Sequence, residues 1–481
     1  MHLRPYQEEA VREIELRIVA GKRRVLVVAP TGAGKTVVFA RVIADAVLRG
    51  QRTLVIAHRR ELVHQTCAKL LEAGLAEDQI GILMASDRRH RSSAPVQVAS
   101  IDTLRRRTKP DADLVIRDEA HRALARTDLA VAALYPDAVH LGFTATPFRA
   151  DRRSLGEFYD DLLVVSTIRN LIAQGYLVEP RVFTVPSDRL PDLSGVRVRG
   201  GDYAQDQLDE AVDQGQLVGN IIEHWAEHAR GVRTVAFAVS VKHSEHIVER
   251  FRAEGVAAEH VDATTPATER DGAVARLLSG VTLLLSNVGV FCEGTDLPPV
   301  KCAVLARPTK STGLYLQQAG RILRPWEGAR AIILDHAGCA REHGLPQDDR
   351  EFSLEPRPKR DASAASEISI RACPGCYAVL PGHTRVCPEC GTTLVESREQ
   401  LPETSGRLVE VDATEQLALQ IEMGAHRRIG WSDTRKRVAF EQLRALARAR
   451  QRGADWVRER FEERFGGPPH PEWADRPWAI P

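Results

Sequence analysis

The sequence predicts an α/β protein built from two doubly wound parallel sheets in series. Short apolar runs alternate with amphipathic stretches from the N-terminus to about residue 345, which is typical of βαβ units. A polar stretch at 186–202 divides this alternation into two comparable halves. The 481 residues are too many for one ordinary core, and 43% hydrophobic content with 5% aromatic residues suits α/β material.

Each expected strand is a short apolar run bounded by polar or turn residues. In the first half these runs lie at 25–28, 53–57, 96–99, 114–116 and 140–143, and in the second half at 234–238, 282–285, 301–305 and 331–334. We therefore expect an N-terminal domain at 1–185 and a second domain at 186–345.

The composition changes after residue 345, where the alternation of strands and helices stops. Residues 346–371 contain a polar Pro/Ser/Ala run and are predicted to form a linker, 372–395 hold four cysteines, and 396–481 are predicted to form a basic helical tail.

Charge and composition exclude few partners. Lys+Arg 66 against Asp+Glu 65 gives a formal net charge of +1, which neither demands nor excludes a polyanion. The N-terminus has no apolar signal region, and no stretch approaches the roughly 18 apolar residues that span a bilayer. We expect a cytoplasmic protein without a membrane partner, in which the eight cysteines are four scattered reduced thiols and a cluster of four that suits a metal site, not disulfides.

A phosphate-binding turn is expected at APTGAGKTVV, residues 29–38, which follows an apolar strand and opens a helix. Gly32 and Gly34 permit positive φ and close backbone approach, so that N–H groups can face phosphate oxygens. Lys35 is expected to reach the β- and γ-phosphates of ATP, and the Thr36 hydroxyl to bind Mg²⁺. The strict motif has Gly where Ala29 stands, and a glycine-rich turn capping an ordinary helix is the alternative. The residues expected to cradle the nucleotide are Thr31, Gly32, Ala33, Gly34, Lys35 and Thr36.

Two adjacent carboxylates end another apolar run, in LVIRDEAHRA. Buried carboxylates are costly unless cations or hydrogen bonds compensate them. Beside a nucleotide, Asp118 is expected to hold Mg²⁺, and Glu119 to accept a proton from the water that attacks the γ-phosphate. The alternative for this segment is a solvated helix start.

The order of these segments resembles a known family. Lys35-Thr36, Asp118-Glu119 and the TAT sequence at 144–146 are similar to motifs I, II and III of the superfamily 2 helicases. In the second half, residues 237–247, 288–298 and 315–325 are similar to motifs IV, V and VI. The resemblance implies two tandem RecA-like domains of a DEAD/DEAH-box (DExH) helicase.

That resemblance also implies roles for individual residues. The pattern Gln-x-x-Gly-Arg-x-x-Arg maps onto Gln317, Gly320, Arg321 and Arg324, which makes Arg324 the arginine finger and Arg321 a second γ-phosphate contact. The implied adenine contacts are Arg4 and Gln7, and the implied coupling residues of motif V are Gly294 and Asp296.

Nucleic-acid contacts are implied by the same comparison. Segments similar to motifs Ia and Ib supply the candidates His58, Arg59, Arg60, Ser100 and Thr103. The sequence departs from the family at Asp102, where relatives commonly carry Gln, and at Arg117, where they commonly carry an aliphatic residue. Arg117 is expected to pair with a carboxylate or nucleic acid, or to be solvated.

The cysteine cluster CPGCYAVLPGHTRVCPEC has the spacing of a zinc ribbon. Its four thiolates suit one tetrahedral, structural Zn²⁺, with a redox dithiol or an iron–sulfur site as the alternatives. His383 is expected at the surface. A ribbon of this size cannot build its own core, so we expect the metal to supply folding energy, and DNA contact and protein docking are equally open. The four expected zinc ligands are Cys373, Cys376, Cys387 and Cys390.

The order of motor domains, linker, ribbon and basic tail resembles the bacterial and phage RadD-like branch of superfamily 2. This implies an ATP-dependent DNA helicase or translocase acting in repair or recombination. Two alternatives stay open at this point. One is an RNA-dependent ATPase, and the other is an ATP-switched adaptor that recruits repair proteins through its ribbon and tail.

Overall fold

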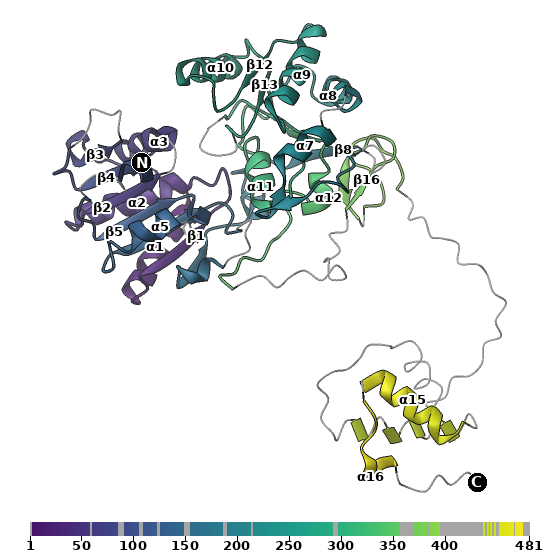
Figure 1. The fold of residues 1–481 in the computed structure, drawn as a ribbon. Helices are drawn as coiled ribbons and strands as arrows, with labels where there is room; N and C mark the ends of the chain where they lie inside the picture. Colours follow the sequence, from purple (N-terminus) through teal and green to yellow (C-terminus); the bar gives the residue numbers. More distant parts are fainter. Residues whose placement is uncertain are drawn as a thin grey trace. The chain divides into compact units, whose positions relative to one another are not determined.

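The computed structural model consists of two compact units, residues 1–396 and 397–481 (Figure 1). Within the first, the structure describes residues 2–57, 60–84, 91–104, 109–122, 126–148, 154–185, 190–212, 215–291, 297–355, 370–382 and 384–394. Within the second, it describes short pieces between 436 and 448 and residues 452–465 and 467–474. No helix in these described segments is both long and apolar enough to cross a membrane.

The first sheet has seven parallel strands in the order β3-β4-β2-β5-β6-β1-β7. Its strands are β1 Arg24–Val28, β2 Thr53–Ala57, β3 Ile80–Leu83, β4 Val96–Ser100, β5 Leu114–Asp118, β6 Val139–Thr144 and β7 Asp161–Val164. Its helices are α1 Pro5–Val19, α2 Lys35–Leu48, α3 Arg60–Glu72, α4 Ile101–Leu104, α5 Arg126–Ala132 and α6 Ile168–Ala173.

Both faces of this sheet are buried, as the alternation of side chains along β1 shows. Val25 and Val27 pack with the apolar faces of α1, α2 and α3, whereas Leu26 and Val28 pack with Phe158 and neighbouring residues on the other face. Short three-residue 3₁₀ turns lie at Glu77–Gln79, Ala120–Arg122 and Leu155–Glu157.

The second sheet has six parallel strands in the order β12-β13-β11-β14-β15-β8. Its strands are β8 Pro180–Thr184, β11 Thr234–Phe237, β12 Ala258–Val261, β13 Leu284–Asn287, β14 Cys302–Leu305 and β15 Ala331–Asp335. The helices of this half are α7 Gln205–Val212, α8 Gly215–His228, α9 Val241–Ala253, α10 Ala267–Ser279, α11 Thr312–Gly320 and α12 Cys339–His343, and β9 Val198–Arg199 pairs with β10 Asp202–Tyr203.

The change from one sheet to the other occurs earlier than the expected boundary at 185. Residues 180–184 fall within the predicted N-terminal domain, but they form β8, which pairs with β15 of the second sheet. Val182 and Phe183 contribute to the two different apolar clusters that cover this sheet, which explains the placement. The connection between the sheets therefore lies between residues 164 and 180.

The cysteine ribbon covers the outer edge of the second sheet. Its hairpin consists of β16 Ile370–Ala372 and β17 Val379–Pro381. Ala378 forms an antiparallel bridge with Phe183 of β8, and the Thr184 N–H donates to the Tyr377 carbonyl at 3.1 Å. An edge strand closed in this way cannot pair with another chain. The ribbon thus shares a core with the domain, which differs from an isolated knuckle that depends on metal alone.

Part of the expected linker is packed. Phe352 and Leu354 contact the cluster beneath β1, and the rings of Phe352 and Phe148 lie 5.3 Å apart. The Arg350 guanidinium donates to the carbonyls of His343 and Leu345. Residues 346–355 therefore follow the surface of the motor, while 356–369 lie outside the described residues.

The C-terminal unit has a small core of its own. Helices α15 Ala454–Phe465 and α16 Pro471–Ala474 pack with helical residues between 436 and 448. The buried centre contains Phe440, Leu443, Ala447, Val457 and Phe461. The aromatic residues of this part of the tail are packing residues.

Candidate active site

The turn between β1 and α2 has the backbone of a phosphate cradle. Gly32 and Gly34 adopt φ of 90° and 78°, the left-handed region that side chains other than glycine rarely enter. A Cβ on Gly34 would lie 2.6 Å from Nε2 of Gln7, and one on Gly32 would lie 2.9 Å from Leu177. The 14-residue helix α2 begins at Lys35 directly after Gly34, so its unpaired N–H groups face this turn.

The adenine-side candidates contact the same turn. Gln7 is buried, its amide Nε2 donates to the Ala33 carbonyl at 3.0 Å, and its Oε1 accepts from the Arg4 N–H. The Tyr6 hydroxyl also donates to Ala33, at 2.9 Å. The Arg4 guanidinium lies 4.6 Å from the ring centre of Tyr176. Arg4 and Gln7 thus lie beside the turn, their role in adenine binding stays a prediction, and the two tyrosines are additions that no motif indicated.

The carboxylate of Glu119 lies between two cationic or ionisable groups. Its Oε1 is 3.3 Å from Nζ of Lys35, and its Oε2 is 3.3 Å from Nδ1 of His121. The backbone of Glu119 has φ of 52°, a left-handed conformation that costs energy for a residue with a side chain. Such strain at a buried carboxylate is typical of a functional site.

The electrostatics keep Glu119 ionised. Burial acts to raise the pKa of its carboxyl, but the ammonium of Lys35 and the His121 imidazole overcome burial and hold the pKa well below the usual glutamate value. A carboxylate that remains charged at neutral pH can accept a proton. Its basicity depends on where the Lys35 ammonium lies.

The oxygen donors expected for magnesium are Asp118 and Thr36. Asp118 is buried at the end of β5, and its Oδ1 accepts from the Glu119 N–H at 2.9 Å. Thr36 is half-buried in the first turn of α2. A carboxylate and a hydroxyl beside a phosphate cradle are the donors that Mg²⁺ prefers, so the residues present fit this ion.

A chain of contacts runs from Glu119 toward the second half of the motor. His121 Nδ1 lies 3.4 Å from Thr144 Oγ1, and that hydroxyl donates to the Thr146 carbonyl at 2.9 Å. A Cβ on Gly313 of α11 would lie 2.9 Å from Oγ1 of Thr146. The TAT segment therefore lies between the carboxylate and the first turn of α11.

The far end of α11 approaches the phosphate cradle. A Cβ on Gly320 would lie 2.5 Å from Cβ of Thr31, and one on Gly32 would lie 3.6 Å from Cγ of Arg324. Gln317 is buried on the same helix, and Arg321 is the C-terminal capping residue. The predicted arginine segment and the predicted phosphate turn, almost 300 residues apart, thus lie side by side.

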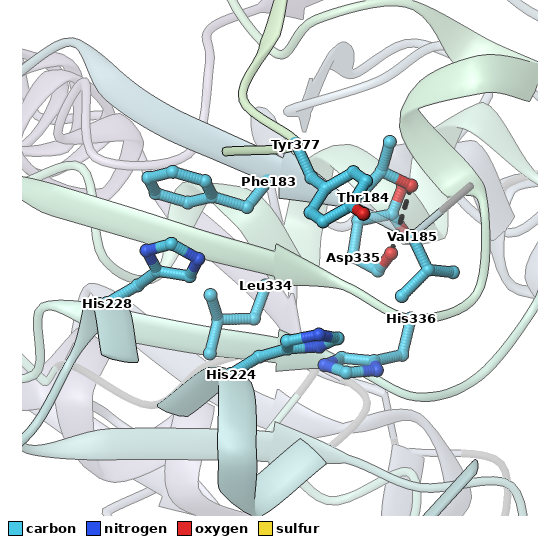
Figure 2. Close-up of a pocket in the computed structure, with 9 residues that line it drawn as sticks. All are labelled: Phe183, Thr184, Val185, His224, His228, Leu334, Asp335, His336 and Tyr377. Carbon is cyan, nitrogen blue, oxygen red and sulfur yellow. Dashed lines mark hydrogen bonds between the residues drawn. The ribbon is translucent and has the colours of Figure 1, made fainter. Parts of the chain in front are cut away.

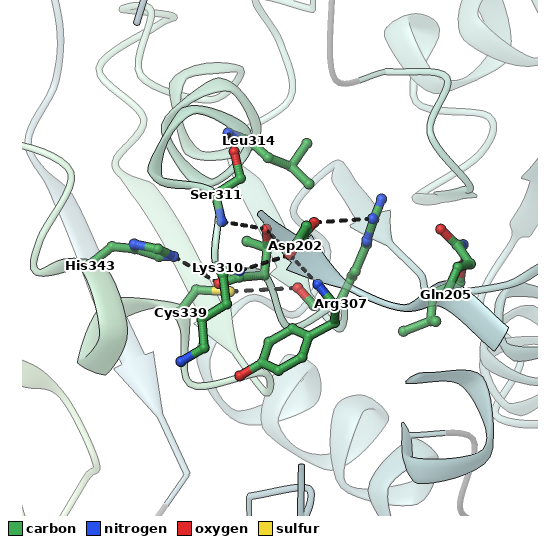
Figure 3. Close-up of polar contacts among 11 residues, drawn as sticks. Asp202, Gln205, Arg307, Lys310, Ser311, Leu314, Cys339 and His343 are labelled. Atoms are coloured by element: carbon green, nitrogen blue, oxygen red, sulfur yellow. Dashed lines mark hydrogen bonds and ion pairs between the residues drawn. The ribbon is translucent and has the colours of Figure 1, made fainter. Parts of the chain in front are cut away.

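A polar network fixes the loop that leads into α11 (Figure 3). Asp202 of β10 accepts from the Thr309 hydroxyl at 3.0 Å and from the Lys310 N–H at 2.8 Å, and forms an ion pair with Arg307 at 3.4 Å. Ser311 then caps the helix by accepting from the Leu314 N–H. This network joins distant residues of no recognised motif, so periodicity could not reveal it.

The side chain of Arg117 is buried and not solvated. It is 2% exposed, and its Nε lies 3.3 Å from Oδ1 of Asp128, which is 1% exposed. Its Nη2 also donates to the Asp128 carbonyl. The expected pairing with a carboxylate is the correct alternative, because Arg117 points into the apolar layer that contains Phe158.

Several nucleic-acid and coupling candidates cannot be placed. Gly294 and Asp296 lie outside the described residues, as do His58 and Arg59 and the side chain of Arg60. Ser100 and Thr103 are hydrogen-bonded to each other at 2.9 Å, and Asp102 is exposed.

The four ribbon cysteines converge on one point. Their sulfur atoms lie within 4.8 Å of one another, with 3.6 Å between Cys373 and Cys390 and between Cys376 and Cys387. Sulfurs about 2.3 Å from a tetrahedral Zn²⁺ would be separated by roughly 3.8 Å. The donor set therefore fits a structural zinc ion. His383 lies outside the described residues.

A small, partly open pocket lies between the ribbon and the second sheet, not at the phosphate turn (Figure 2). His224 and His228 of α8, His336 and Tyr377 line it, and the His228 ring stacks on Phe183 at 4.0 Å. Burial lowers the pKa of His336 to about 3, so its imidazole is neutral. Within the described part of the chain, these histidines form no metal cluster.

Two family models match the chain, one in each half of the motor. Residues 1–149 match the model described as type III restriction enzyme, res subunit. Residues 215–325 match the helicase conserved C-terminal domain. The first match contains the phosphate turn and both carboxylates, and the second contains the arginine segment.

Similar proteins include a 51.5 kDa protein of a Lactococcus phage, 30% identical over 87% of this chain and 88% of the relative. The Irc3 protein of Saccharomyces cerevisiae, named as an ATP-dependent helicase, is 30% identical over 73% of this chain and 55% of the relative. The EcoKI type I restriction endonuclease subunit of Escherichia coli is 25% identical over 67% of this chain and 33% of the relative. The chain thus spans most of the phage protein, but little more than half of the yeast one.

Solved structures show the same fold at low identity. A fragment assigned as the HsdR subunit of a type I restriction enzyme from Vibrio vulnificus YJ016 has a TM-score of 0.57 and 20% identity, covering 72% of this chain and 66% of that one. The type ISP restriction-modification enzyme LlaBIII, solved bound to DNA, has a TM-score of 0.52 and 19% identity, covering 69% and 27%. Both are similar in the two-sheet motor.

Proposed function

The chain belongs to the DExH-type helicases of superfamily 2, which are nucleic-acid-dependent ATPases, and we propose that it hydrolyses ATP to move on or remodel DNA. The observation that carries the proposal is the approach of Gly320 and Arg324 to Thr31 and Gly32. A site divided between two sheets is complete only when they close on each other. Binding and loss of the γ-phosphate then change the relative stability of the closed state.

The residues of the site divide the chemistry among them. Backbone N–H groups at 31–36 and the Lys35 ammonium bind phosphates, and Arg321 and Arg324 neutralise charge that develops on the γ-phosphoryl group. Thr36 and Asp118 would hold Mg²⁺, which supplies further charge neutralisation when bound. Glu119 accepts the proton of the attacking water as the γ-phosphoryl group leaves ADP.

The pair between Lys35 and Glu119 suggests how the base is activated. The ammonium lies 3.3 Å from the carboxylate and lowers its proton affinity. Phosphate oxygens that attract Lys35 weaken this pair, so the proton affinity of Glu119 rises when substrate is in place. The base then gains strength at the step that needs it.

Glu119→Gln is the first test of this assignment. We expect ATP turnover to fall at least about 100-fold, because the amide cannot accept the proton, while ATP binding is retained. Exposed Glu254→Gln is the matched control and should leave turnover unchanged. Normal hydrolysis by Glu119→Gln would contradict the proposed base.

DNA is the proposed nucleic acid, with RNA the main alternative. Steady-state hydrolysis is measured without nucleic acid and with single-stranded, duplex and forked DNA and single-stranded RNA, at one salt concentration because phosphate contacts are salt-dependent. Stimulation selective for DNA supports the proposed DNA-dependent motor. Stimulation by RNA alone would show that the protein is an RNA-dependent ATPase.

A second role is proposed for the C-terminal unit. It has its own apolar core, built around Phe440, Leu443 and Phe461. An independently packed unit suits recruitment of the motor to repair proteins or to a DNA structure. The ribbon is less suited to this role, because its bridge and hydrogen bond to β8 already occupy one of its edges.

A further inference from the structure

Arg324 stands on irregular backbone, beyond the end of the helix that carries the rest of its motif. α11 ends at Gly320, so residues 321–324 have no helical ladder to fix them. The last turn of α11 is already loose, since the Arg321 and Ile322 N–H groups make i−3 contacts of 3.3 and 3.4 Å. Other contacts must hold this segment if the Arg324 guanidinium is to meet the phosphate turn.

Three consecutive carbonyls of this segment are held from outside it. The Lys301 ammonium donates to the Ile322 carbonyl at 3.2 Å and to the Arg324 carbonyl. Between them, the Leu323 carbonyl accepts from the Val178 N–H at 2.8 Å. Lys301 immediately precedes β14, and its own carbonyl accepts from the Ile332 N–H of β15 at 2.8 Å, so the ammonium is anchored to the sheet.

Burial of the Lys301 ammonium lowers the stability of the folded protein. Lys301 is 2% exposed, and within the described residues its ammonium contacts carbonyl oxygens and no carboxylate. Burial, together with the nearby charge of Arg324, lowers the pKa of Lys301 to about 8. A buried cation without an anionic partner destabilises a protein unless its hydrogen bonds compensate, and an apolar side chain of similar size is commonly better for stability.

We propose that Lys301 is a positioning residue for Arg324, holding the backbone at 322–324 so that the guanidinium meets the phosphate turn. This inference rests on the proposed role of Arg324 in ATP hydrolysis. Lys301 acts through another residue and does not touch the substrate. It lies outside every motif, which is why the sequence pattern gave no sign of it.

The experiment compares Lys301→Met, Arg324→Ala and the double variant in the full-length protein, with exposed Lys109→Met, which lies outside the named motifs, as the control. The measurements are kcat and KM for ATP with saturating DNA, and the free energy of unfolding in urea. We expect Lys301→Met to lower kcat by roughly 10- to 100-fold with KM within about threefold, because a small displacement of a catalytic group has effects of this size. Its free energy of unfolding should be equal to or higher than that of the unaltered protein.

The double variant separates positioning from general damage. Because Lys301 acts through Arg324, the double variant should have the kcat of Arg324→Ala within about twofold. The inference is overturned if the loss of kcat in the double variant is the product of the losses in the two single variants, or if Lys301→Met has normal kcat. If Lys301→Met proves less stable, Lys301→Gln decides: it keeps N–H donors and should recover kcat at least about tenfold over Lys301→Met, and no recovery overturns the inference.

Failure of the proposed function gives a different result. If Arg324→Ala retains normal turnover, the arginine assignment itself is wrong. If Arg324→Ala loses turnover and Lys301→Met does not, the ATPase mechanism stands and only the role of Lys301 is wrong.

Discussion

Individual residues of the active site combine strain with close packing. Glu119 holds a left-handed backbone, and the glycines of the phosphate turn and of α11 leave no room for side chains. Such features reduce stability and persist where the surrounding structure supports them. Backbone conformation and the space around each Cα therefore limit which residues can replace those of this site.

Gly320→Ala is expected to lower kcat by at least about tenfold without unfolding the protein. The added Cβ would lie 2.5 Å from Cβ of Thr31, so α11 and the phosphate turn must separate. Single-turnover ATP hydrolysis measures the effect. Gly195→Ala, whose Cβ would meet nothing within 4 Å, is the control, and equal rates for the two variants would contradict the close approach.

His140 is expected to make stability fall as the solution becomes acidic. Burial lowers the pKa of His140 to about 4, against the ordinary 6.5, and the charges of Arg117 and Arg24 act in the same direction. Below pH 6.5 the His140 imidazole is protonated in the unfolded chain, whereas in the folded protein it stays neutral until about pH 4. Stability is therefore complete above pH 6.5 and is lost by roughly 1.4 kcal/mol per pH unit between these values.

Substitution of His140 by Gln isolates this contribution. His140 Nε2 lies 2.9 Å from the Tyr135 carbonyl, and a Gln amide can donate to the same carbonyl without titrating. Urea unfolding at pH 5 and pH 7 should show a smaller pH dependence for His140→Gln. An unchanged difference would mean that other groups, such as His336, produce the effect.

Central and outer strands differ in how well the sequence predicts them. Every expected strand appears, with ends shifted by a few residues. Within the two large sheets, the strands that the apolar runs do not predict are β3, β7, β8 and β12, and these are the outer strands of the two sheets. Outer strands pair on one side only, so their apolar pattern is less continuous and gives a weaker signal.

Metal removal should destabilise the motor and not only the ribbon. Cys373, Cys387, Ala378 and Leu380 belong to the same apolar cluster as Phe183 of β8. We therefore expect Cys376→Ser or chelation to lower the Tm of the main unfolding transition by several degrees. Metal content is measured on the same samples, and a loss of metal with no change in Tm would contradict a shared core.

The two compact units are expected to unfold and act separately. Deletion of 397–481 leaves the ribbon and both sheets intact, so basal ATP turnover and the main Tm should be preserved. Binding to a DNA structure or to a partner protein should weaken if the C-terminal unit recruits the motor. Calorimetry and binding measurements on the truncated chain test both points, and a large loss of basal turnover would show that the C-terminal unit supports catalysis directly.

The order of apolar runs in the chain predicts the α/β class and the two parallel sheets that the structure shows. Short motifs of glycine, carboxylate and cysteine residues predict the phosphate turn, the paired carboxylates and the four-cysteine site. These are local signals, because a strand, a turn or a knuckle is encoded within about ten residues. The contacts of Lys301 with the Arg324 segment, Asp202 with the loop before α11 and the ribbon with β8 join residues more than 20 positions apart in the chain. No local pattern records such pairings, because they arise from the way in which buried polar groups and sheet edges find partners when the chain packs.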